Sequence, residues 1–203
     1  MNLIILKNLI SLLLSITLLF ISSAPLSAAE EVAIFAGGCF WCLEHDLEVI
    51  DGVISAESGY SGGTLSKPTY QSHDGHQESV LIHFDNNKIT YNQLLINYLR
   101  NIDPFDGNGQ FCDRGDSYRP MIFSIDEKQK KSANKAIEEI SDRFSVPLNQ
   151  IKIEIKDATK FWLAEEYHQD YASKNQIKYM FYRNACGRDK RLRDVWEKAK
   201  LKY

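Results

Sequence analysis

The stretch Gly37-Gly38-Cys39-Phe40-Trp41-Cys42 marks the point where the chain changes from a strand pattern to a helix pattern. Residues 32–35, just before it, form a short apolar run that is typical of a buried strand. Beyond the glycines, apolar residues recur at steps of three or four and predict an amphipathic helix: Phe40, Leu43, Leu47 and Ile50. Cys39 therefore falls at a helix start, where free N–H groups and the helix dipole favour negative charge. We expect its thiol to have a lowered pKa and to act as a nucleophile.

Cys42 follows one helical turn later, and the pair allows three interpretations: a structural or buried cysteine pair, a metal site, or a redox site. A zinc site needs more ligands, and Cys112 and Cys186 stand alone and far apart, so we predict no metal. The insert Phe40-Trp41 differs from the small or proline-containing insert of thioredoxins. Two large aromatic rings beside the sulfur suit an apolar substrate group such as a methyl, although ordinary core packing explains Phe40 equally well.

The rest of the pattern mixes strands and helices without a regular alternation. Strands are expected at residues 53–58, 79–84, 121–125 and 151–155, and helices at 91–99, 126–144 and from 188 to the end. Residues 103–119 contain three glycines and one proline, and such long loops in compact domains are usually functional. This order favours an α+β sandwich of two layers around a small, mixed or antiparallel sheet.

The first 29 of the 203 residues differ from the remainder, because Lys7 is their only charged side chain. An apolar core at residues 9–21 and small residues near Ala28 and Ala29 predict a cleaved signal peptide at 1–29, followed by one catalytic domain at 30–203. An uncleaved anchor is the alternative. Either way we expect an exported, periplasmic protein in an oxidising compartment. The nearly balanced charge of the body predicts no nucleic-acid partner, and we expect a monomer without stable membrane association after cleavage.

Several motifs run in order through nearly the whole body of the chain. They are Gly38-Cys39-Phe40-Trp41, Gly59-Tyr60-Ser61-Gly62-Gly63, Pro68-Thr69-Tyr70, Gly75-His76-Gln77-Glu78, Asp103-Pro104, Asp113-Arg114-Gly115, Tyr118-Arg119 and residues 164–171. With these motifs the chain closely resembles the A-type peptide methionine sulfoxide reductases. The resemblance implies a two-layer α/β fold with a ferredoxin-like core, no cofactor, and reduction of methionine-S-sulfoxide, free or in proteins, to methionine.

The resemblance also implies roles for individual residues. Cys39 would be the nucleophile, Glu78 the acid that protonates the sulfoxide oxygen, and Asp113 a carboxylate that holds the substrate and the polar network. Phe40 and Trp41 would form the pocket that receives the substrate methyl. Tyr70 and Tyr118 would donate hydrogen bonds from their hydroxyl groups to the sulfoxide oxygen. The chemistry needs such an acid, because the sulfoxide oxygen leaves only with a proton. To donate at neutral pH, Glu78 must have a pKa raised by burial; a lone glutamate at a strand start is otherwise solvated.

Attack would leave Cys39 as a sulfenic acid, which a second thiol converts to a disulfide for reduction by a thioredoxin-like partner. Cys186 is the first candidate for this resolving thiol, because relatives often keep such cysteines near the C-terminus. The tail holds only one cysteine, however, and Cys42 stands where many relatives have glycine, so Cys42 is a rival. Cys112, beside Asp113, is the third candidate.

Two other functions compete with this reading. One is a periplasmic disulfide oxidoreductase that uses the Cys-x-x-Cys motif, and the other is a secreted domain held by two structural disulfides. The remaining histidines are read as structural or solvated, and we expect His76 and His168, inside two of the motifs, to support loops by hydrogen bonds.

Overall fold

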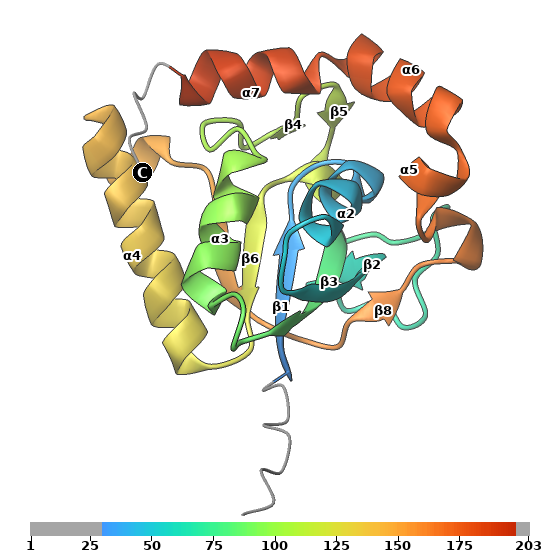
Figure 1. Cartoon of the computed structure of the whole chain (residues 1–203), viewed down its shortest axis with the longest axis horizontal. Helices are drawn as coiled ribbons and strands as arrows, with labels where there is room; N and C mark the ends of the chain where they lie inside the picture. Colours follow the sequence, from blue (N-terminus) through green and yellow to red (C-terminus); the bar gives the residue numbers. More distant parts are fainter. Residues whose placement is uncertain (1–29, 198–203) are drawn as a thin grey trace, which may run out of the picture.

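The computed structural model describes residues 30–197, and a six-stranded sheet lies at its centre (Figure 1). The order across the sheet is β7-β6-β1-β3-β2-β8. The strands are β1 (Glu30–Ala36), β2 (Val53–Ser61), β3 (Gln77–Asp85), β6 (Met121–Ser124), β7 (Glu154–Asp157) and β8 (Trp162–Leu163). Neighbouring strands are antiparallel except β6 and β7, which run parallel. The sheet is therefore mixed and mainly antiparallel, as expected, but it has more strands than the small sheet that the sequence predicts.

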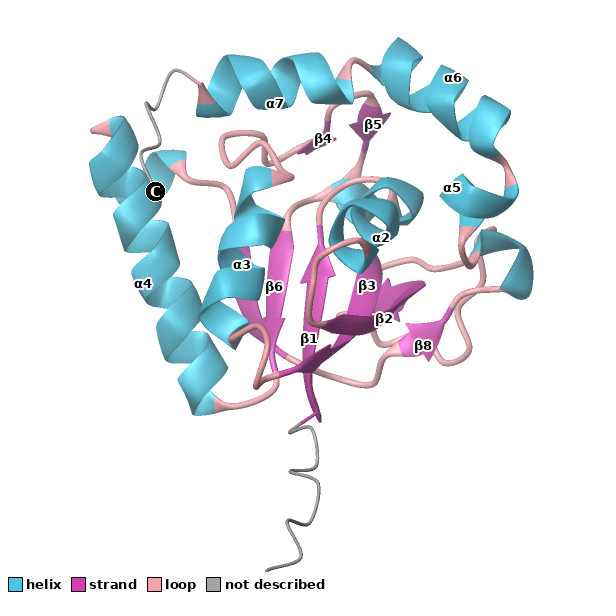
Figure 2. Cartoon of the chain, in the orientation of Figure 1, coloured by secondary structure: helices cyan, strands magenta, loops and turns pink. Residues whose placement is uncertain are grey.

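Helices pack on the sheet and close one of its ends (Figure 2). Their bounds are α2 (Phe40–Glu48), α3 (Tyr91–Arg100), α4 (Glu127–Phe144), α5 (Tyr171–Lys174), α6 (Gln176–Cys186) and α7 (Arg188–Trp196). In Figure 1, α6 and α7 arch over the end of the sheet where β1 leads into α2. The short strands β4 (Gly109–Gln110) and β5 (Asp113–Arg114) lie beneath this arch. Within residues 30–197, none of these helices combines the length and the apolar character that crossing a membrane requires.

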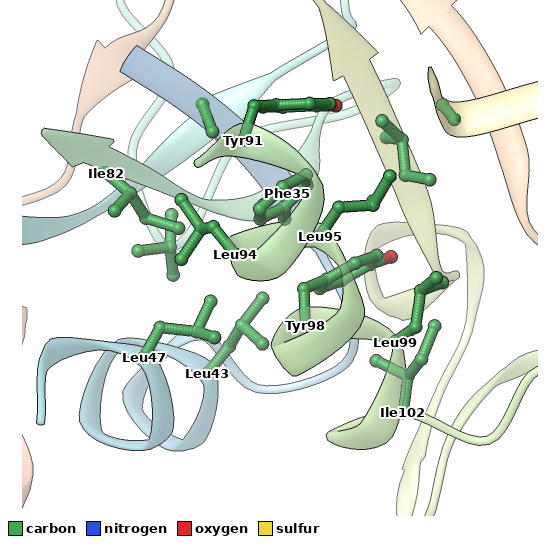
Figure 3. Close-up of a cluster of buried hydrophobic side chains, with 14 of the residues drawn as sticks. Phe35, Leu43, Leu47, Ile82, Tyr91, Leu94, Leu95, Tyr98, Leu99 and Ile102 are labelled. Atoms are coloured by element: carbon green, nitrogen blue, oxygen red, sulfur yellow. The ribbon is translucent and has the colours of Figure 1, made fainter. Parts of the chain in front are cut away.

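The main core lies between the sheet and the helices α2, α3 and α4. Figure 3 shows how Leu43 and Leu47 of α2 face Leu94 of α3, with Phe35 and Ile82 of the sheet beside them. All five side chains are fully buried. The apolar spacing in α2 is thus explained by one face packed against α3 and the sheet, and this packing fixes the position of the α2 start.

Three expectations from the sequence need revision. The strand predicted at 151–155 is β7 at Glu154–Asp157, because Lys152 N–H donates to the Pro104 carbonyl (2.7 Å) instead of joining the sheet. The long loop at 103–119 contains the β4–β5 hairpin. Helices α5 and α6 were not foreseen. The signal peptide predicted at 1–29 and the end of the predicted C-terminal helix, residues 198–203, lie outside the described residues.

Candidate active site

Two glycines place Cys39 at the end of β1. A Cβ atom on Gly37 would lie 2.5 Å from Ile102 Cγ2, and one on Gly38 would lie 2.8 Å from Gln110 Cβ. Gly38 also has a φ of +81°, which side-chain-bearing residues rarely adopt. Cys39 then caps α2 without using its side chain as a cap. The tight turn therefore delivers the sulfur to the helix start, as the sequence predicts.

The backbone N–H groups at the start of α2 donate hydrogen bonds to carboxyl groups and not to the sulfur of Cys39. The Phe40 N–H donates to Glu78 Oε2 at 3.1 Å, and the Cys39 N–H donates to the carboxyl group of Asp113. Glu78 comes from β3 and is only 1% exposed. Burial raises the pKa of Glu78 to about 8, outweighing the hydrogen bonds from Phe40 and Tyr118. Glu78 therefore holds a proton at neutral pH and can donate it.

The sulfurs of Cys39 and Cys42 lie together in one buried cluster, and both thiols are free. Burial raises the pKa of Cys39 well above its ordinary value, and Cys42 and the Glu78 charge add to this rise. The pKa of Cys42 is lowered, first by a hydrogen bond from Cys39. The lowered pKa expected for Cys39 from its helix position is thus wrong. The physical reason is that the helix N–H groups stabilise Glu78 and Asp113, so the dipole does not compensate for the burial of this thiol.

Aromatic rings form a wall beside the two sulfurs. Trp41 stacks on Tyr171 at 3.7 Å between ring centroids, and its Nε1–H donates to Nδ1 of His168 at 2.9 Å. Phe40 is 1% exposed within the main core and lies 4.9 Å from the His168 ring. Phe40 therefore has the core packing that the sequence left open, while Trp41 is held on one side by His168 and on the other by Tyr171.

Hydroxyl groups gather around Glu78 and Asp113. Tyr118 donates to Glu78 and is also hydrogen-bonded to Tyr70. Tyr182 of α6 donates to both carboxylate oxygens of Asp113, at 2.9 and 2.7 Å. Burial raises the pKa of Asp113, whereas the Tyr182 hydrogen bond lowers it. These donors converge from the loop after β2, the β5 region and α6 on the space beside Cys39.

Cys186 is not brought to Cys39. It forms a disulfide with Cys112, across 74 residues of sequence, with a Cα–Cα distance of 5.0 Å. This bond joins the end of α6 to the residue before Asp113, and Cys112 is exposed. Cys112, Asp113 and Cys186 could otherwise present three ligand atoms to a metal, but the two sulfurs are bonded to each other here.

The structure brings together most of the predicted site and adds residues that sequence reasoning missed. Cys39, Phe40, Trp41, Cys42, Glu78, Tyr70, Tyr118 and Asp113 converge, and Tyr171, Tyr182, Arg183 and Arg188 join them. One signal could have found Tyr182 and Arg183: they lie three and four residues after Tyr179 and four and three residues before Cys186, as on one helix face. His76 supports its loop as expected, accepting from Gly63 N–H at 3.2 Å.

Comparison with known proteins places this geometry in context. Residues 31–200 match the family model described as peptide methionine sulfoxide reductase. The chain is 47% identical over 181 residues to peptide methionine sulfoxide reductase MsrA 2 of Caulobacter vibrioides, covering 86% of this chain and 91% of the relative. It is 49% identical over 158 residues to MsrA of Ligilactobacillus salivarius, covering 74% and 90%.

Solved structures show the same architecture. Mxr1 of Saccharomyces cerevisiae in its reduced form is similar with a TM-score of 0.66 and 29% identity, over 72% of this chain and 86% of that one. Methionine sulfoxide reductase A of Corynebacterium diphtheriae, at 24% identity and a TM-score of 0.63, shares the fold over 72% of this chain and 76% of that one.

Proposed function

Since the chain belongs to the peptide methionine sulfoxide reductase family, we propose that it reduces methionine-S-sulfoxide, free or in proteins, by thiolate attack of Cys39 on the sulfoxide sulfur. It is an oxidoreductase that acts on a sulfur group. The observation that carries the mechanism is Glu78, a buried carboxyl with a pKa of about 8 beside the nucleophile. A protonated acid at this place can give the sulfoxide oxygen its proton as Cys39 attacks.

The surrounding groups fit the remaining needs of this reaction. Trp41, fixed by Tyr171 and His168, offers an apolar surface for the substrate methyl. Tyr70 and Tyr118 offer hydroxyl donors to the oxygen, as in an oxyanion hole. Asp113 holds the Tyr182 hydroxyl, which also reaches Cys39. The β-α-β-β-α-β order of β1, α2, β2, β3, α3 and β6, which we interpret as a ferredoxin-like core, carries this site at one end.

Cys42 is the first resolving thiol in this proposal. It lies one turn from Cys39 in the same buried cluster and is free, whereas Cys186 is bonded to Cys112. Single turnover therefore forms a Cys39–Cys42 disulfide. A thioredoxin-like dithiol outside the cytoplasm then restores the two thiols by thiol–disulfide exchange and is itself oxidised to a disulfide. The predicted signal peptide supports a role in the repair of oxidised exported proteins in the periplasm.

Thiol counting after one turnover tests the choice of resolving cysteine. Protein purified without reductant holds two free thiols and is mixed with one equivalent of methionine-S-sulfoxide. The wild type and Cys186→Ser should lose the Cys39 and Cys42 thiols together, and Cys42→Ser should stop at a sulfenic acid that dimedone traps. A disulfide that forms at the wild-type rate in Cys42→Ser would exclude Cys42 as the first resolver.

An activity comparison separates the proposal from a general disulfide oxidoreductase. Both cysteines of the Cys-x-x-Cys motif are buried, with Cys39 at 6% and Cys42 at 2% exposure, which suits a small sulfoxide group better than a protein disulfide. The protein should reduce methionine sulfoxide with a dithiol and leave insulin disulfides intact. Insulin reduction without sulfoxide reduction would reverse this assignment.

A further inference from the structure

The disulfide between Cys112 and Cys186 joins two segments that each supply a group of the active site. Cys112 directly precedes Asp113, whose carboxyl group accepts from the Cys39 N–H. Cys186 is the last residue of α6 and follows Tyr182 by about one helical turn. The Tyr182 hydroxyl donates to both oxygens of Asp113, at 2.9 and 2.7 Å. The covalent bond and this hydrogen-bonded pair therefore hold the same two segments together.

Helix α6 is anchored to the rest of the fold by a small set of side chains. In Figure 1 it arches over the end of the sheet, and Tyr179 is its buried residue. Ile177 and Phe181, on the outer side of the helix, are 88% and 77% exposed. Arg183 adds an ion pair to α2 with an N–O distance of 2.8 Å. The disulfide at Cys186 is the restraint that acts on the last turn of α6, beyond these anchors.

The disulfide is open to an attacking thiolate from the Cys112 side. Cys112 is exposed, and Cys186 lines the surface hollow of about 460 Å³ together with Phe111 and Arg191. The Cys112 N–H donates to the sulfur of Cys186 at 3.1 Å. An N–H donor stabilises a thiolate, and a stabilised thiolate leaves faster in disulfide exchange. Attack on Cys112 with departure of Cys186 is therefore the favoured direction.

We propose that the Cys112–Cys186 bond is a redox switch on the active site: when formed it holds Tyr182 on Asp113, and when a dithiol reduces it α6 loosens and attack by Cys39 slows. The inference goes beyond the proposed function. It rests on that function for the slower chemical step, but not for the loosening of α6. Cys112 and Cys186 are positioning residues, because they act on the reaction through Tyr182 and Asp113.

The reduction step balances with the dithiol as the electron donor. A thiolate of the dithiol attacks the Cys112 sulfur, a mixed disulfide forms, and the bond to Cys186 breaks with its electron pair on the Cys186 sulfur. The second thiol of the dithiol then attacks its own partner sulfur and releases the Cys112 thiolate. The dithiol ends as a disulfide, and the two cysteines take up the two protons that it lost. Exchange with an oxidised dithiol runs the same steps backwards and closes the switch.

Tyr182 links the switch to the nucleophile. Its hydroxyl also forms a hydrogen bond with the Cys39 sulfur. Burial is the largest cause that raises the pKa of Cys39, and the Tyr182 hydrogen bond opposes it. When the end of α6 loosens, this hydroxyl is less often in place on Cys39 and Asp113. The Cys39 thiolate then forms less readily, and attack on the sulfoxide slows.

Hydrogen exchange tests the loosening of α6 without any substrate. Wild type with the disulfide formed is compared with wild type that a dithiol has reduced and that holds four free thiols after the dithiol is removed without air. At short labelling times, which report local opening, the amides of α6 should exchange about tenfold faster after reduction, while those of α3 should not change. Unchanged exchange in α6, or an equal rise in α3, would overturn the proposal.

A single turnover without reductant tests the effect on the reaction. The Cys112→Ser/Cys186→Ser double variant should release methionine from one equivalent of methionine sulfoxide about tenfold more slowly than wild type, as for loss of one well-placed hydrogen bond. Ala185→Ser adds a hydroxyl at an exposed position of α6, keeps the disulfide and should match wild type. Reduced wild type gives the same measurement without a substitution, and circular dichroism shows that each protein is folded.

Tyr182→Phe shows whether the switch acts through this hydroxyl. In that background, removing the disulfide should slow methionine release less than twofold further, because the two changes remove the same interaction. A folded double variant that is as fast as wild type, or a full tenfold further loss in the Tyr182→Phe background, would overturn the proposal. Absence of methionine release by wild type would contradict the reductase function instead, and the exchange measurement would still decide the switch.

Discussion

Burial decides the protonation of two glutamates that the sequence presents as ordinary. Glu78 and Glu44 are each 1% exposed, and burial raises their pKa values to about 8 and about 7. Glu78 lies beside Cys39, whereas Glu44 accepts from the Asp170 N–H at 3.3 Å and ties α2 to the segment that carries His168. The residue type alone does not predict such burial, because an isolated glutamate at a strand start is usually solvated. The resemblance indicated Glu78, but only the fold explains how it keeps its proton.

Glu78→Gln removes the proposed acid while preserving its shape. We expect the rate of sulfoxide reduction at neutral pH to fall roughly 10²–10³-fold, as for loss of a comparable donor in other enzymes. The wild-type rate should fall as pH rises through about 8, because Glu78 then loses the proton that it must donate. A pH–rate profile of the sulfenic-acid-forming step checks this. If Glu78→Gln retained the wild-type profile, another group would be the acid.

Glu44 links pH to stability. Its folded pKa of about 7 lies above the ordinary 4.5, so the folded protein holds the proton more tightly. The stabilisation of the folded protein that comes from protonated Glu44 is therefore fully present below about pH 4.5 and is lost as pH rises through about 7. Glu44→Gln should unfold like wild type at the acid end and be more stable by about 3 kcal/mol above neutrality.

Denaturant titrations across this pH range measure the difference. Glu48→Gln, at an exposed position of the same helix, leaves Glu44 in place; it serves as the control and should keep the pH dependence of the wild type. An unfolding free energy of Glu44→Gln that tracks wild type at every pH would mean that Glu44 ionises freely in the folded state.

At the scale of elements, the sequence predicts the site best where one element supplies neighbouring residues. The β1–α2 turn was predicted from its own glycines and helical spacing, and it holds Cys39, Phe40, Trp41 and Cys42 as expected. Helix α6 was missed, and with it Tyr182, because its exposed residues Ile177 and Phe181 blur the apolar pattern. Partners that lie far apart in sequence, such as Trp41 with His168, follow only from the packing of whole elements.

The turn that starts α2 is sensitive to a single methyl group. Gly38→Ala forces a side chain into a positive φ and against Gln110, so we expect a loss of about 1–3 kcal/mol in the free energy of unfolding. Because the same turn positions Cys39, activity should fall as well. Gly187→Ala, also at positive φ but with open space around it, isolates the cost of the backbone conformation. Equal losses in both variants would show that the contact with Gln110 contributes nothing.

For the molecule as a whole, the Cys112–Cys186 disulfide joins the end of α6 to the loop at residues 103–119, which carries Asp113 and Tyr118. It closes a loop with a sequence separation of 74, so it restricts the unfolded chain strongly. Cys186 also lines a surface hollow of about 460 Å³ together with Phe111 and Arg191. Sequence reasoning placed both cysteines but did not pair them, because their partnership depends on how α6 crosses the β4–β5 hairpin.

Cys112→Ser should lower the free energy of unfolding by about 4 kcal/mol under oxidising conditions. Reductant should destabilise the wild type by a similar amount and leave the Cys112→Ser variant unchanged. Thermal unfolding with and without a dithiol measures both effects. A wild-type melting temperature that is insensitive to the dithiol, while thiol counting shows the bond reduced, would contradict a stabilising role.

The most direct test of the whole account is activity on separated epimers of a methionine sulfoxide substrate, with wild type and Cys39→Ser and a dithiol as reductant. Wild type should reduce the S epimer and leave the R epimer, and Cys39→Ser should reduce neither. Reduction of the R epimer by wild type, or turnover by Cys39→Ser, would contradict it.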